Sequence, residues 1–123
     1  MEAEHADIIE RIRQLPPGTV IPKPEARSDF KVKGIGMRRG EDALVYLIPN
    51  NKGGRLHEKG VTFTEFSKAF AELSRSGILT RAWANAHIPE CVENDSCNFT
   101  TIGGVFSLLG HARYRRRGIY ERT

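Results

Sequence analysis

Residues 62–80 read TFTEFSKAFAELSRSGILT, and this stretch decides the class of fold. Thr62 and Glu65 match the capping box, in which each side chain bonds a free backbone N–H of the first helical turn. Gly77 stands where a left-handed residue ends a helix. The stretch therefore predicts an amphipathic helix over 63–76, whose buried stripe consists of Phe63, Phe66, Phe70 and Leu73.

Two strand-like runs precede this helix. Over residues 30–38 (FKVKGIGMR) apolar side chains alternate with lysines at the start, which is the pattern of a half-buried strand. Residues 43–48 (ALVYLI) are continuously apolar, as in a more central strand. The RGED between them supplies a turn, so the two runs predict a β-hairpin. A mobile loop is expected next, at 49–54.

The N-terminal part is expected to hold one helix and one extended connection. Residues 3–15 place four apolar side chains at helical spacing, and the Pro-Pro-Gly that follows ends the helix. Residues 16–29 contain four of the six prolines. They predict an extended segment that crosses the body, with Val20 and Ile21 packed on the core.

The C-terminal part ends in a helix that contains a glycine pair. Asn98 is a good N-cap, and a wide apolar face follows it. Because each glycine costs about 1 kcal/mol against alanine inside a helix, Gly103 and Gly104 indicate the close approach of another backbone. The expected elements are, in order, a short strand or turn with one helical turn at 78–88, an acidic loop at 89–96, this helix at 99–109, and a last strand at 111–121.

These elements together predict an α+β fold. Helices and strands are mixed without a regular βαβ rhythm, which favours a small antiparallel sheet with about three helices packed on one face. We expect one domain over 1–123, made of the helix at 3–15, the Pro-rich connection at 16–29 and an α+β body at 30–123.

Composition bounds the function classes. Hydrophobic residues make up 39% and charged residues 28% of the 123, which is typical of a globular chain. No apolar run is long enough to span a bilayer, and the acidic, amphipathic N-terminus is unlike a signal peptide. We therefore expect a cytoplasmic protein with no membrane partner, two reduced cysteines, and no cofactor or metal.

The net charge of +4 is unevenly distributed. Residues 31–60 carry seven Lys/Arg against three Asp/Glu, and residues 98–123 carry five against one. The rest of the chain is acidic, so these two blocks hold all of the excess positive charge. Such alternation favours a polarised surface.

The first functional hypothesis is nucleic-acid binding. Both basic blocks coincide with expected strands, and outward side chains would form one positive face if those strands shared a sheet. Arginine suits phosphate because its planar fork donates two parallel hydrogen bonds, and the interleaved Tyr114 and Tyr120 could stack on bases. The candidate backbone-binding residues are Lys31, Lys33, Arg38, Arg39, Arg113, Arg115, Arg116 and Arg117, with Tyr114 for stacking. The simplest alternative is a solvated sheet edge guarded by charge.

A helix-turn-helix over 62–87 is a second route to DNA binding. It has a capped helix, a turn at Gly77 and a further segment in the right order. We disfavour it because that further segment offers only Arg81 and Asn85 as base-reading side chains.

The runner-up function is self-association or small-ligand binding. A self-complementary surface needs both signs of charge, and the chain has separate acidic and basic blocks. In this hypothesis the arginines pair with acidic groups of a neighbouring copy.

Cysteine chemistry is the third hypothesis. Cys97 lies just before the expected C-terminal helix, where N–H dipoles lower a thiol pKa, and His87 or His111 would be its base in a hydrolase. Together with Cys91, the same side chains could supply four zinc ligands, but their spacing matches no common zinc module. A non-catalytic protein is therefore the expectation.

Overall fold

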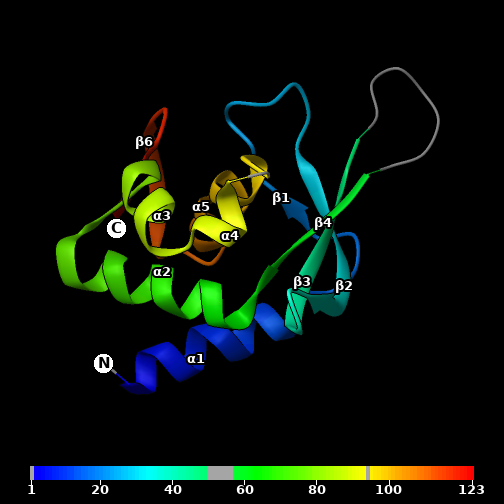
Figure 1. The fold of residues 1–123 in the computed structure, drawn as a ribbon, viewed down its shortest axis with the longest axis horizontal. Helices are drawn as coiled ribbons and strands as arrows, with labels where there is room; N and C mark the ends of the chain where they lie inside the picture. Colours follow the sequence, from blue (N-terminus) through cyan, green and yellow to red (C-terminus); the bar gives the residue numbers. More distant parts are fainter. Residues whose placement is uncertain (1, 50–56, 94) are drawn as a thin grey trace.

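The computed structural model describes residues 2–49, 57–93 and 95–123. It confirms the α+β class, with the strands divided between two antiparallel sheets that lie at opposite ends of the long axis (Figure 1). Most of the loop predicted at 49–54 lies outside the described residues. The described helices are α1 (Glu2–Arg13), α2 (Phe63–Ser76), α3 (Arg81–His87), α4 (Pro89–Val92) and α5 (Cys97–Leu108).

The larger sheet contains the predicted hairpin. Its strands follow the order β1 (Val20–Ile21), β2 (Phe30–Arg38), β3 (Glu41–Ile48) and β4 (His57–Thr62). Arg39 and Gly40 join β2 to β3 with φ of 50° and 77°, as a two-residue type I′ turn requires. The edge strand β1 buries Ile21 but leaves Val20 exposed, so the prediction that both pack on the core is wrong for Val20.

The smaller sheet has the order β5 (Ile78–Thr80), β7 (Ile119–Arg122) and β6 (Ala112–Arg116). The prediction of one last strand over 111–121 is therefore wrong, because the chain turns at Arg117 and Gly118 and forms a hairpin. A register shift between Tyr114 and Arg116 interrupts the alternation on which the single strand was predicted. Gly118 has a φ of 78°, which only glycine adopts at no cost.

Helix α2 forms as its sequence predicts. Both hydrogen bonds of the capping box are present between Thr62 and Glu65, and Gly77 ends the helix with a φ of 83°. The chain then continues through β5 into α3, which confirms the short strand followed by a helical turn that was predicted at 78–88. Because β5 separates α2 from α3, the pair is not a helix-turn-helix.

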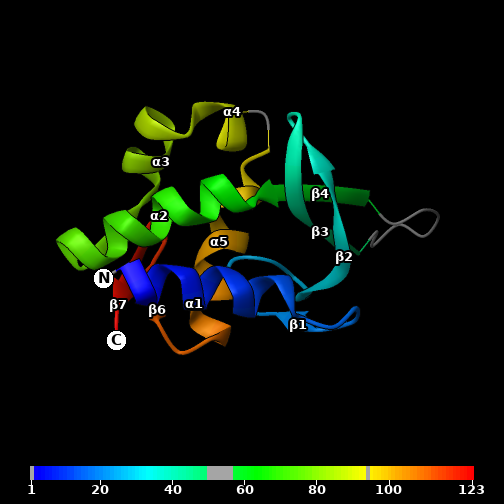
Figure 2. The same ribbon diagram turned by 90° about the horizontal axis from the view of Figure 1, so that it is seen from below.

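Helix α5 is the centre of the molecule. Nine of its twelve residues are buried, because it packs against β1, β4, β6 and α4. Figure 2, seen from below, shows α1 and α2 side by side with α5 behind them. Buried side chains from both sheets and from the helices form one continuous core around α5.

Two predictions about the start of α5 are wrong. The acidic segment 89–96 contains the short helix α4, and α5 begins at Cys97, ahead of the expected cap. Asn98 is fully buried within the first turn instead of capping it. Its Nδ2 donates to the Cys91 carbonyl at 2.7 Å, and its Oδ1 accepts from the Tyr46 hydroxyl at 2.5 Å. Asn98 thereby ties α5 to α4 and β3.

The glycine pair of α5 permits close packing, as predicted. A Cβ at Gly104 would lie 2.6 Å from the Pro22 carbonyl oxygen, which is the backbone approach that the sequence indicated. A Cβ at Gly103 would overlap the ring of Tyr120 from β7. The two glycines therefore let the β1 segment and the smaller sheet pack closely against neighbouring positions of one helix.

We expect Gly104→Ala to destabilise the fold by about 2 kcal/mol, because the clash with the Pro22 backbone outweighs the better helix propensity of alanine. Urea denaturation of both proteins measures the difference. Ala71→Gly, at an exposed position of α2, is the matched control and should cost only about 1 kcal/mol. A stabilised Gly104→Ala protein would show that the packing is looser than described.

Candidate functional site

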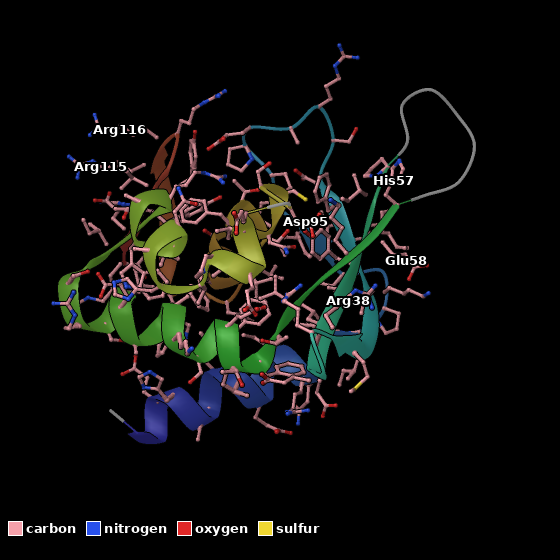
Figure 3. All side chains as sticks on the ribbon, viewed as in Figure 1. Arg38, His57, Glu58, Asp95, Arg115 and Arg116 are labelled. Atoms are coloured by element: carbon pink, nitrogen blue, oxygen red, sulfur yellow. The ribbon has the colours of Figure 1, made fainter. Side chains whose placement is uncertain are left out.

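The two basic blocks do not form one face on one sheet. Lys31, Lys33 and Arg38 belong to β2 in the larger sheet, whereas the arginines of 113–117 lie on or beside β6 in the smaller one. Figure 3 shows Arg38 near one end of the molecule, and Arg115 and Arg116 near the other. The blocks are therefore two separate candidate surfaces.

The block on the larger sheet is largely engaged with neighbouring groups. Lys33 pairs with Glu58 at 2.7 Å, and Arg39 pairs with Glu65 at 2.6 Å while donating to the Gly60 carbonyl. Burial raises the pKa of Glu65, but the hydrogen bonds from Arg39 and from the Thr62 N–H outweigh it and hold that pKa below its usual range. Two members remain, of which Lys31 is exposed and Arg38 donates to the Met37 carbonyl.

The block on the smaller sheet is more open. Arg113 pairs with Glu121 at 2.7 Å, and Arg115 approaches the same carboxylate at 4.0 Å. Arg116 and Arg117 are exposed, and within the described ranges neither pairs with a carboxylate. The tip of the β6–β7 hairpin therefore presents guanidinium groups to solvent.

The two tyrosines of this hairpin differ in exposure. Tyr114 is half-buried, with its ring edge-on to Tyr120 at 5.5 Å between centroids. Tyr120 is fully buried against α5, so the hypothesis that it stacks on bases is wrong. Desolvation and the neighbouring Glu25 carboxylate raise the pKa of Tyr114.

Arg81 connects the hairpin turn to the start of α5. Its backbone N–H donates to the Gly118 carbonyl at 2.9 Å, and its Nη2 donates to the Ser96 carbonyl at 3.0 Å. The guanidinium lies 4.9 Å from the centre of the Phe99 ring, in cation–π geometry. Arg81 thus holds the arginine-rich turn beside the N-terminus of α5.

A pocket of about 170 Å³ opens at this junction. Its most unusual member is Lys23, which is only 3% exposed. The Lys23 Nζ donates to the Cys97 carbonyl at 2.8 Å and to the Thr100 Oγ1 at 2.7 Å, and it lies 4.2 Å from the Phe30 ring centre. The pocket is lined by Lys23, Glu25, Ala26, Phe30, Arg81, Ser96, Cys97 and Thr100.

The environment of Lys23 disfavours its charged form. Burial lowers the pKa of the amine to about 7, and interactions with Cys97 and Glu25 offset this only in part. Buried lysines are rare unless they are paired, yet the Lys23 Nζ forms no ion pair with any described carboxylate. The pocket therefore has one titratable amine beneath its surface and one guanidinium, that of Arg81, in its wall.

The candidate zinc and thiol residues do not converge. His87 stacks on Trp83 and His111 packs edge-on against Phe70, and neither contacts Cys97. The Cys97 Sγ instead lies 3.4 Å from the Tyr46 hydroxyl oxygen, whose hydrogen is donated to Asn98 Oδ1. Across the described ranges no three metal-ligating side chains come together, and Cys97 lacks the histidine base that the hydrolase hypothesis needs.

Sequence reasoning missed Lys23 as a site residue and considered Arg81 only as a base-reading side chain of a disfavoured helix-turn-helix. Lys23 stands between Pro22 and Pro24 in a connection that was expected only to cross the body. The flanking prolines restrict the backbone there, which is the one local feature that marks the position. That this lysine is buried follows from contacts with residues 74 and 77 positions away.

Comparisons with known proteins add no constraint to this geometry. No family model matches the chain, and no curated protein or solved structure is significantly similar to it. None of the described helices is long and apolar enough to cross a bilayer. The two basic surfaces and the pocket are therefore the features from which a function can be inferred.

We expect the stability difference between the wild type and Lys23→Met to change with pH. Between about pH 7 and 10.5 the unfolded chain holds a proton on Lys23 that the folded chain has lost, so the wild type gains stability relative to the variant as pH rises. The slope is at most about 1.4 kcal/mol per pH unit. Urea denaturation at pH 6, 7, 8 and 9 measures it.

Lys33→Met, at an exposed lysine of β2, is the matched control and should show no such slope. A difference between Lys23→Met and the wild type that stays constant from pH 6 to 9 would mean that Lys23 remains charged in the fold.

Proposed function

We propose that this protein binds the backbone of nucleic acids through its β6–β7 hairpin. The observation that carries the proposal is the exposure of Arg115, Arg116 and Arg117 at the tip of the hairpin. Among the described residues, Arg116 and Arg117 have no carboxylate partner, and Arg115 approaches Glu121 only at 4.0 Å. Guanidinium groups in this state keep all their donors for phosphate oxygens. The proposed interface is restricted to this hairpin and Arg81, because the basic block on the larger sheet lies elsewhere and is partly neutralised.

The hairpin supports backbone contact better than base recognition. Its tip stands at the edge of the molecule, beside α3 (Figure 1). Phosphate contacts fix a protein on nucleic acid but carry no sequence information. With Tyr120 buried and Tyr114 half-buried, stacking is limited to the exposed part of Tyr114. We therefore expect binding with little sequence preference.

Self-association is the second candidate. Ile35 and Met37 are 53% and 57% exposed. They share one face of β2 and follow the part of that strand whose side chains are buried in the core. Covering them with a second copy would remove apolar surface from water. Light scattering of the wild type and of Ile35→Ser/Met37→Ser tests this: a dimer that the double variant dissociates supports self-association, and a monomeric wild type excludes it.

We expect binding of a labelled DNA duplex to weaken steeply with salt. Four phosphate contacts by Arg81 and the three tip arginines give a log–log slope of about −3.6, and neutralising the tip removes about 2.7 of it. The test is fluorescence anisotropy at 50–300 mM salt with the wild type and with Arg115→Gln/Arg116→Gln/Arg117→Gln.

The matched control removes the same charge from the larger sheet, as Lys31→Gln/Lys33→Gln/Arg38→Gln. It should leave the slope unchanged. If both triple variants lose the same part of the salt slope, the DNA is attracted by the net charge of the protein and not by a defined site. Absence of binding even at 50 mM salt would make the hairpin a charge-guarded sheet edge.

A further inference from the structure

We propose that the pocket at the N-terminus of α5 binds a single phosphate group, and that this is the terminal phosphate of a nucleic-acid strand held by the hairpin. The second part rests on the proposed function, whereas the first stands on the pocket itself. The residues that would hold the phosphate are Lys23, Arg81 and Thr100.

The donors come from three separate segments. Lys23 belongs to the connection between β1 and β2, Arg81 is the first residue of α3, and Thr100 lies in the first turn of α5. All three line the pocket, so a ligand there would meet an ammonium and a guanidinium. The Thr100 hydroxyl donates its hydrogen to the Cys97 carbonyl at 3.1 Å and would turn it to the ligand on binding. Phosphate and carboxylate groups are the ligands that such a donor set fits.

The charge balance of the pocket favours an anion. The Lys23 Nζ donates two hydrogen bonds to neutral acceptors, the Cys97 carbonyl and the Thr100 hydroxyl. A protonated amine therefore has a third hydrogen left to donate to a ligand. No side chain caps the start of α5, and the positive end of the helix dipole adds to the field there. An incoming phosphate would supply the direct ion pair that no described carboxylate gives Lys23.

The other charged groups around Lys23 set the limits of this attraction. Glu25 also lines the pocket and repels an anion, but its carboxylate interacts with Tyr114. Asp29 accepts the Lys23 backbone N–H at 2.9 Å. The Cys97 thiol interacts with Tyr46, and Arg81 contributes positive charge from α3.

The position of the pocket points to the end of a strand. Arg81 bonds the Gly118 carbonyl of the hairpin turn, so the pocket lies beside the arginines that would hold the backbone. A phosphate inside a strand has a nucleoside attached on each side, and these two nucleosides hold that phosphate at the protein surface. Lys23 lies beneath the surface, where only a group at the end of a chain reaches it.

Phosphate binding is linked to the protonation of Lys23. Because burial lowers the pKa of this amine to about 7, an anion at higher pH must bind together with a proton. We expect the affinity for sulfate, which does not itself titrate between pH 6 and 9, to fall by up to about tenfold per pH unit above pH 7. A surface site formed by arginines alone would show no such dependence.

The first experiment measures binding of inorganic sulfate and phosphate by titration calorimetry at pH 6 to 9. We expect Lys23→Met to lose this binding and the exposed Lys33→Met control to keep it. Thr100→Val, which removes one hydroxyl at nearly constant volume, provides a second variant that should weaken binding even if Lys23→Met does not fold. Wild-type sulfate affinity in Lys23→Met or in Thr100→Val would overturn the pocket assignment.

The second experiment compares single-stranded octanucleotides that carry a phosphate at the 5′ end, at the 3′ end or at neither. We expect one terminal phosphate to tighten binding about tenfold, and Lys23→Met to abolish this advantage while leaving the affinity for the unphosphorylated strand unchanged. The tip triple variant should weaken all three strands alike.

The outcomes separate the two proposals. Sulfate binding without binding of any oligonucleotide would refute the proposed function and the strand-end part, and would leave a free oxyanion as the ligand. Oligonucleotide binding with no advantage for either terminal phosphate would also overturn the strand-end part. Absence of sulfate and phosphate binding at pH 6 would refute the pocket, whatever the hairpin does.

Discussion

The burial of α5 between two small sheets is the constraint on which the rest of the structure depends. Its glycine pair lets the Pro22 backbone approach on one side and the Tyr120 ring on the other. Neither sheet is large enough to form a core alone, so each must pack its apolar face on this helix. The pocket is a consequence, because the segments that converge on α5 meet at its N-terminus.

Lys23 shows how this packing creates an unusual chemical group. The connection that carries it is held against α5 through Pro22 and Ile21, and the lysine side chain is buried there. There it finds neutral hydrogen-bond acceptors but no carboxylate partner among the described residues. Desolvation of the amine opposes folding, and the phosphate proposed above would offset that cost by pairing with it.

The two arginine-rich segments illustrate how identical residue types come to differ in pairing and exposure. Arg39 is held in a turn conformation that places its guanidinium on Glu65, beside the N-terminus of α2. Arg116 and Arg117 lie at the end of a short hairpin that extends away from the core, where no described carboxylate meets them. The difference arises from which acidic residues the fold brings near, and not from local sequence.

The sequence alone determined the elements that depend on neighbours along the chain. The cap and stripe of α2, the hairpin of β2 and β3, and the need for glycine in α5 all follow from local hydrogen bonding, turn geometry and periodicity. Only the tertiary structure decided that β6 and β7 form a separate sheet, that Asn98 is buried, and that Lys23 lies beneath a pocket. The physical reason is that the burial of a polar group depends on residues far away in the chain, such as Cys97 for Lys23, which no local pattern records.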